Sequence, residues 1–145
     1  MDLSHIPIYD HHAHALFHEN VWRTAPLEPY FTEAYDPEQL PFTQDNLYFR
    51  RSTRDLAEFY GCEATVDAVL ETRQKWDYLE LCRTMFAKAN MSHWLVDDGI
   101  WTDRLWSVGE CAEKLPPKVH RVARLETELA TFVPRYDSVG TLFDA

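Results

Sequence analysis

The chain has 145 residues, 46% of them hydrophobic, and a formal net charge of −10 at pH 7. This is enough apolar material for a single packed domain, whereas the acidic excess argues against nucleic-acid binding, because phosphate contacts need a basic face. Three scattered cysteines are typical of a protein from a reducing compartment. The sequence contains neither a secretory signal pattern nor a long apolar run, so we expect a cytoplasmic protein without membrane association.

The first predicted element is a strand over residues 6–14, which contains the sequence DHHAH. Because side chains alternate along a strand, Asp10, His12 and His14 are expected on one face. Two imidazoles one residue apart lie roughly 6.6 Å apart along a strand and can lean onto one ion, at the roughly 2.0–2.1 Å bond length that imidazole prefers. The spacing therefore predicts His12 and His14 as metal ligands, with Asp10 as a further ligand or as the partner of one.

Two simpler interpretations of this stretch stay open, namely a metal-scavenging tail and a histidine-rich surface loop without an ion. Most of the histidines lie close together, at His5, His11, His12, His14 and His18. The apolar residues before Asp10 favour instead a buried strand that delivers ligands at its carboxyl end. If the cluster only scavenges metal, His5 and His18 should matter to metal affinity as much as His12 and His14.

Residues 15–75 are predicted to form a helical insertion. Four prolines interrupt long helices in its first part: Pro26, Pro29, Pro37 and Pro41. A short helix is expected over 52–60, where a serine and an aspartate three residues later resemble a capping box, and Gly61 fits its end. A second helix is expected over 65–74.

Residues 76–145 are predicted to form βα units. Apolar residues at three- and four-residue steps predict a helix over 76–89, and an apolar run predicts a buried parallel strand over 91–96. The sequence DDG follows this strand. Its acidic residues, Asp97 and Asp98, could contact substrate or metal-bound water, or could only form a turn in which the glycine takes a positive φ.

The next helix is expected to be capped by Thr102 or Asp103, before a third strand over 119–125. Arg124 and Glu126 at the end of that strand could bind substrate, or could form an ordinary ion pair. The whole pattern of strand, helical insertion, helix, strand, helix, strand and helix indicates an α/β chain with parallel strands.

The motif IYDHHAH, with His12 and His14, resembles the Asp-x-His-x-His signature that ends the first barrel strand in the amidohydrolase superfamily. Residues 79–99 also resemble the first barrel helix and second strand of its amidohydrolase-2-like branch, which includes the domain fused to glutamine-synthetase-like proteins. There, too, a helical insertion follows the first strand. The resemblance covers most of residues 6–128, but only its first motif carries catalytic residues.

This resemblance implies a single partial domain, the helix-rich N-terminal portion of a TIM (β/α)8 barrel. It also implies a metal-dependent hydrolase that cleaves an amide, ester or related bond of a small-molecule substrate through metal-activated water. His12 and His14 match the first-strand ligands of the family, and zinc is the expected divalent ion. The catalytic residues themselves stay unassigned, because the general base and the remaining ligands would lie outside this chain.

The chain departs from the family in length. A complete barrel takes about 250 residues, and the ligands that later strands supply have no counterpart in 145 residues. Three strands cannot close a barrel, so their open edges predict a homo-oligomer or a complementary chain as a partner. Two alternatives to an enzyme are a catalytically inactive truncated domain that serves as a binding or assembly module, and a small helical protein with an adventitious histidine cluster.

Overall fold

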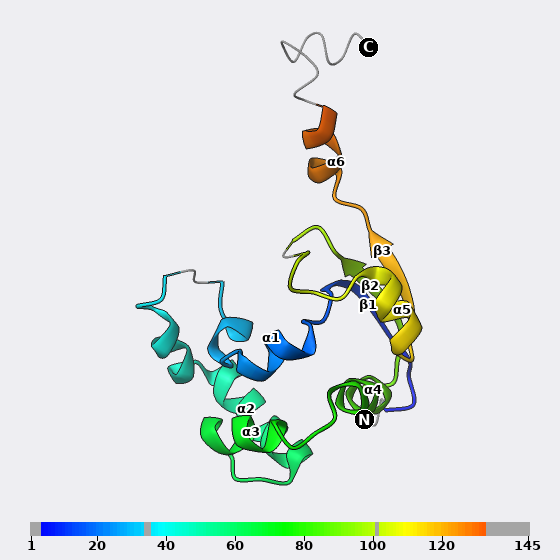
Figure 1. Ribbon diagram of the computed structural model, residues 1–145. Coiled ribbons are helices and arrows are strands. Elements are labelled where there is room, and N and C mark those ends of the chain that lie inside the picture. The colour runs from blue at the N-terminus through cyan, green and yellow to red at the C-terminus, as the bar shows by residue number, and fades with distance from the viewer. Residues whose placement is uncertain (1–3, 34–35, 101, 133–145) are drawn as a thin grey trace. The chain divides into compact units, whose positions relative to one another are not determined.

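The computed structural model describes residues 4–33, 36–100 and 102–132 (Figure 1). The chain divides into two compact units. One unit, called the sheet unit below, comprises the residues up to His18 and those from Cys82 onward. The other, called the helical unit, comprises Glu19–Leu81. The weak helical character that the sequence suggests for residues 136–145 lies outside the described residues.

The sheet unit is built on three parallel strands in the order β1-β2-β3. They are β1 (Ile8–His14), β2 (Met91–Asp97) and β3 (Lys118–Val122). The central strand β2 is bonded on both sides, and its Trp94 and Val96 are only 3% and 0% exposed. An apolar run predicted this strand, as expected for a strand buried within a parallel sheet. Its carboxyl end is therefore held firmly from both sides.

Helix α4 (Tyr78–Lys88) precedes β2, α5 (Val108–Lys114) lies between β2 and β3 in the chain and packs on β3, and α6 (Leu125–Phe132) follows β3 (Figure 1). Phe86 of α4 meets Trp94 edge to face, with ring centroids 4.9 Å apart. Cys111 of α5 is fully buried, and burial raises the pKa of its thiol. Apolar burial against these helices stabilises the sheet.

The prediction that the chain forms the N-terminal portion of a TIM (β/α)8 barrel is wrong. The described residues form a small α/β domain with an open three-stranded parallel sheet, in which β1 and β3 each pair on one side only. A (β/α)8 barrel requires eight strands closed on themselves. The alternating sequence pattern correctly predicted parallel strands joined by helices, but such a pattern determines the type of strand and not whether the sheet closes.

Helix α5 begins later than predicted, because Ser107 caps it in place of Thr102 or Asp103. The Ser107 hydroxyl accepts a hydrogen bond from the Glu110 N–H at 3.2 Å, and the Glu110 carboxylate accepts one from the Ser107 N–H at 3.0 Å. This is a complete capping box, and the Ser-x-x-Glu spacing in the sequence could have identified it.

Replacing Ser107 by alanine is expected to lower the free energy of unfolding by about 1 kcal/mol.

Replacing Glu110 by glutamine should destabilise the fold in a pH-dependent way, since hydrogen bonds from Ser107 and Lys114 lower the pKa of Glu110 to about 2. A depressed folded-state pKa gives stability that is present above the unfolded value near 4.5 and is lost as the pH falls toward about 2.

Urea unfolding at several pH values between 7 and 2 measures this effect. The difference between wild type and Glu110→Gln should be constant at neutral pH and shrink below pH 4.5. Glu113→Gln, an exposed position on the same helix, is the matched control and should show a smaller effect. A difference for Glu110→Gln that persists unchanged to pH 2 would contradict the assigned role.

The helical unit contains α1 (Glu19–Thr24), α2 (Leu47–Tyr60), α3 (Val66–Arg73) and two 3-10 helices, η1 (Glu28–Phe31) and η2 (Leu40–Asp45). Its buried core consists of Leu27, Phe49, Ala57 and Val69. None of the described helices is both long and apolar enough to cross a bilayer.

The predicted ends of these helices are partly confirmed. Thr65 caps α3, and Gly61 ends α2 in the left-handed region at φ 68°. The start of α2 was predicted wrongly, because Asn46 caps the helix and its side chain accepts a hydrogen bond from the Tyr48 N–H at 2.7 Å. Ser52 lies inside this helix, so its resemblance to a capping residue was misleading.

Candidate metal centre

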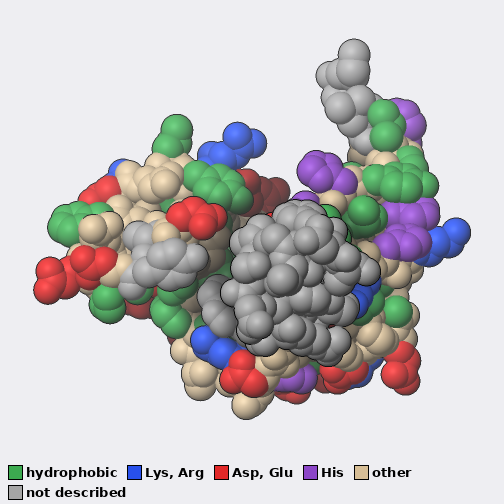
Figure 2. Space-filling model, turned by 90° about the horizontal axis from the view of Figure 1, so that it is seen from above, with side chains coloured by type: hydrophobic (Ala, Val, Ile, Leu, Met, Phe, Trp, Pro, Cys, Tyr) green, Lys and Arg blue, Asp and Glu red, His purple; other side chains and the backbone are tan. Residues whose placement is uncertain are grey.

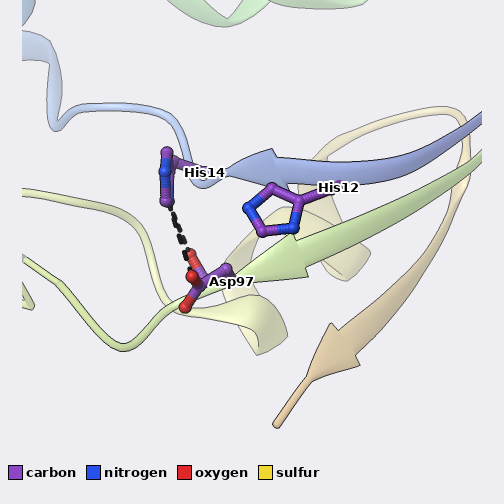
Figure 3. A group of neighbouring side chains, drawn as sticks. All are labelled: His12, His14 and Asp97. Carbon is purple, nitrogen blue, oxygen red and sulfur yellow. Dashed lines mark hydrogen bonds and ion pairs between the residues drawn. The ribbon is translucent and has the colours of Figure 1, made fainter. Parts of the chain in front are cut away.

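The carboxyl ends of β1 and β2 lie next to each other, and three potential metal ligands meet there (Figure 3). These are His12 and His14 of β1 and Asp97 of β2, and one ligand atom from each lies within 4.8 Å of the other two. Among the described residues this is the only group of three or more such side chains. The strand pairing brings together residues that are 83 positions apart in the chain.

A β-bulge in β1 determines which side chains reach this place. Asp10 pairs with Trp94 and Ala13 pairs with Val96, so β1 has one more residue than β2 between these two pairs. Paired residues of parallel strands share a face, and His14 pairs with Asp97, three residues after Trp94. Asp10 therefore lies on the face opposite to His14, and the predicted common face of Asp10, His12 and His14 fails at Asp10.

Asp10 has a structural contact at the bulge. Its carboxylate accepts a hydrogen bond from the His12 backbone N–H at 3.2 Å. The donor is the backbone of His12 and not its imidazole, so the bond positions the main chain at the bulge and does not orient the His12 ring.

The three ligands differ in exposure. Asp97 is 2% exposed, whereas the side chain of His14 is 43% exposed. His14 Nδ1 lies 3.4 Å from the Asp97 carbonyl oxygen and 4.0 Å from its carboxylate oxygen Oδ2. The His12 and His14 rings meet edge to face, with centroids 5.7 Å apart. The carboxylate thus lies at the base of the centre, and the imidazoles lie on its solvent side (Figure 3).

Asp97 is held in its ionised form. Burial by itself raises the pKa of this carboxyl group, but the Gly99 N–H donates to Oδ1 at 2.9 Å and the Arg124 side chain donates to both oxygens. Together with the nearby His14, these donors lower the pKa of Asp97 below its usual value. A ligand carboxylate must be deprotonated, so Asp97 is ready to bind a cation at neutral pH.

The turn interpretation of the DDG sequence is confirmed in part. The Gly99 N–H bond to Asp97 Oδ1 is the turn contact typical of aspartate. Gly99 does not take the predicted positive φ, since Gly61 is the only described glycine that does. Gly99 instead leaves room for Arg124, because a Cβ atom there would overlap Arg124 Cδ and lie 3.0 Å from its Nε.

The other predicted site residues lie outside the group of three. Asp98 pairs with Arg121 at 3.0 Å, and Arg124 forms an ion pair with Asp97 at 2.7 Å. Glu126 is exposed on α6. Asp97 was expected at most to contact substrate or metal-bound water, and it was not predicted as a metal ligand beside the two histidines. An assumption that β1 and β2 are neighbours would have suggested it, because both residues stand at the carboxyl end of a strand.

A second histidine feature lies on the same sheet. Tyr9 stacks on His93 with centroids 4.0 Å apart, and His93 stacks on His120 at 5.6 Å. Histidine side chains gather at the surface around the strands in Figure 2. The rings of His93 and His120 are parallel within 2°, an arrangement that suits stacking rather than shared ligation of one ion.

No protein-family model and no curated protein sequence matches the chain. A solved structure from Lactobacillus casei ATCC 334, described as a "putative metal-dependent hydrolase", has a similar fold, with a TM-score of 0.72 and 20% sequence identity. The match covers 98% of this chain and 38% of the other, so the chain spans well under half the length of that protein. The likeness is one of fold, and it extends over both units of the chain.

Proposed function

We propose that the chain binds one divalent metal ion through His12, His14 and Asp97 and forms part of a metal-dependent hydrolase of the amidohydrolase type. The observation that carries this proposal is the meeting of three ligand atoms within 4.8 Å at the ends of two adjacent strands. Two imidazoles and one carboxylate are the protein ligands of many catalytic zinc sites, which keep a fourth position open. The fold shared with a protein described as a metal-dependent hydrolase supports it further.

The ligands fit an ion after a small adjustment. Donor atoms around a tetrahedral zinc lie roughly 3.4 Å apart at bond lengths of about 2.0–2.1 Å. The present separations of up to 4.8 Å must therefore shorten. The imidazoles can make this change by side-chain rotation, because both are exposed at the end of an edge strand. Nitrogen and oxygen donors with an open position favour zinc, although the same set also suits iron(II).

Within such a site the residues of the chain have separate roles. A bound zinc ion would act as a Lewis acid and activate water for attack on an amide, ester or related carbon. His12 and His14 hold the ion on the solvent side, where a small-molecule substrate can approach. The buried carboxylate of Asp97 is kept ionised and oriented by the Gly99 N–H. The general base and any further ligands are proposed to lie outside this chain.

A catalytically inactive binding or assembly module is the second candidate. The open edges at β1 and β3 favour it, because a homo-oligomer or a complementary chain could add to either edge. It shares the fold of the first candidate and differs in whether a complementary segment exists that completes the active site. The alternative interpretation as a small helical protein is wrong, since the described residues contain a three-stranded parallel sheet.

Elemental analysis of untagged protein, loaded with zinc and passed through a desalting column, tests the proposal. We expect one ion per chain, removed by a chelator and restored by added zinc. A panel of ester and amide substrates is then assayed: turnover that follows the zinc content would exclude an inactive module. A loaded protein that retains no metal would contradict the metal site and the hydrolase, and would favour the inactive module.

A further inference from the structure

Arg124 already binds the carboxylate oxygens of Asp97 that a metal ion would need as ligands. Its Nε donates to Asp97 Oδ1 at 2.9 Å and to Oδ2 at 2.7 Å. Oδ2 is also the carboxylate oxygen that faces His14, 4.0 Å from Nδ1. The oxygen best placed to bind an ion is therefore the one closest to the guanidinium group.

Gly99 makes this position possible for Arg124. A Cβ atom at Gly99 would overlap the Cδ of Arg124, and its Cγ would lie 3.2 Å away. Any residue larger than glycine must push the arginine side chain off its present path. Gly99 also donates its N–H to Asp97, a contact that alanine at this position would keep. Because Gly99 has no side chain, the Arg124 guanidinium group can reach the Asp97 carboxylate.

We propose that Arg124 is a resident cation that competes with a divalent metal ion for Asp97, so that the Asp97–Arg124 pair and metal binding oppose each other. The inference rests on the metal site proposed above. With Arg124 in place, the charge of the buried carboxylate is compensated and the protein avoids an unpaired buried charge. An incoming ion meets a positive group at ion-pair distance from its own ligand and is repelled by it.

Arg124 can leave without a large rearrangement. Its side chain is 38% exposed, whereas that of Asp97 is 2% exposed. Displaced by an ion, the guanidinium group moves into water and stays charged. Linkage then requires the opposition to be mutual: the ion weakens the pair by as much as the pair weakens binding of the ion.

Zinc titration against a competing chelator tests the inference in wild type and variants. Arg124→Gln removes the charge and should tighten zinc binding at least tenfold. Arg124→Lys keeps a charge without the planar group and should give an intermediate affinity. Gly99→Ala should also tighten binding, although Arg124 is still present, because it displaces the side chain. Arg121→Gln is the matched control: it removes an arginine from Asp98, the next residue, and should leave the affinity within about twofold.

A measurement on the wild type guards against variants that fold poorly. The Nε–H signal of Arg124 in an NMR spectrum should shift when one equivalent of zinc is added, and that of Arg121 should not. Unchanged or weaker zinc binding in both Arg124→Gln and Gly99→Ala, or an unmoved Arg124 signal at zinc saturation, would overturn the inference while leaving the metal site intact. Absence of zinc binding in every form would overturn the metal site itself and this inference with it.

Discussion

Replacement of His12 and His14 together by alanine is expected to abolish stoichiometric zinc binding. The two imidazoles supply two of the three ligand atoms that lie within 4.8 Å of one another. Loss of a residue that merely supports a ligand costs roughly 10–100-fold in metal affinity. Loss of two ligands should therefore raise the dissociation constant by more than about 100-fold. Competition with a chromophoric chelator measures this change directly.

A second double variant provides the control. His5→Ala with His18→Ala removes the same number of imidazoles from the same part of the chain. Both residues are described by the structure, and neither belongs to the group of three. We expect its zinc affinity to stay within about threefold of wild type. An equal loss in the two double variants would show a metal-scavenging cluster in place of a defined site.

Replacement of Phe49 by alanine should produce the largest loss of stability in the helical unit. Phe49 is 2% exposed and lies in the core with Leu27, Ala57 and Val69. Its ring also meets Phe31 edge to face, with centroids 5.2 Å apart. Truncation of a buried phenylalanine leaves a cavity and lowers the free energy of unfolding by about 3–5 kcal/mol. Urea unfolding followed by circular dichroism measures the loss.

Phe42→Ala is the matched control in the same unit. Phe42 is 71% exposed in η2, so removal of its ring leaves no buried cavity. The free energy of unfolding should change by less than about 0.5 kcal/mol. Similar losses in the two variants would mean that Phe49 is not a core residue.

Local features of this fold could be predicted from the sequence. The apolar run before the DDG sequence identified β2, and Gly61 marked the end of α2 through capping chemistry. Such signals depend on a few neighbouring residues, so a single sequence carries them. Helix α5 was misplaced although its Ser107–Glu110 spacing was available, because Thr102 and Asp103 offered a competing cap.

Features that depend on strand pairing could not be predicted in the same way. The bulge between Asp10 and Ala13 appears only in the register of β1 against β2, and it separates Asp10 from His14. Asp97 joins the histidines because β1 and β2 are adjacent, and this contact spans 83 positions. The predicted barrel failed for the same reason: the local pattern does not report how many strands a sheet contains or whether it closes.

X-ray absorption spectroscopy of the zinc-loaded chain tests the central claim most directly. The metal site predicts one zinc with two imidazole nitrogens at about 2.0–2.1 Å and a carboxylate oxygen at about 2.0–2.2 Å. Any zinc that the variant lacking His12 and His14 retains should show no imidazole contribution. A zinc surrounded only by oxygen atoms, or an imidazole contribution that survives this double replacement, would contradict a metal centre at the ends of β1 and β2.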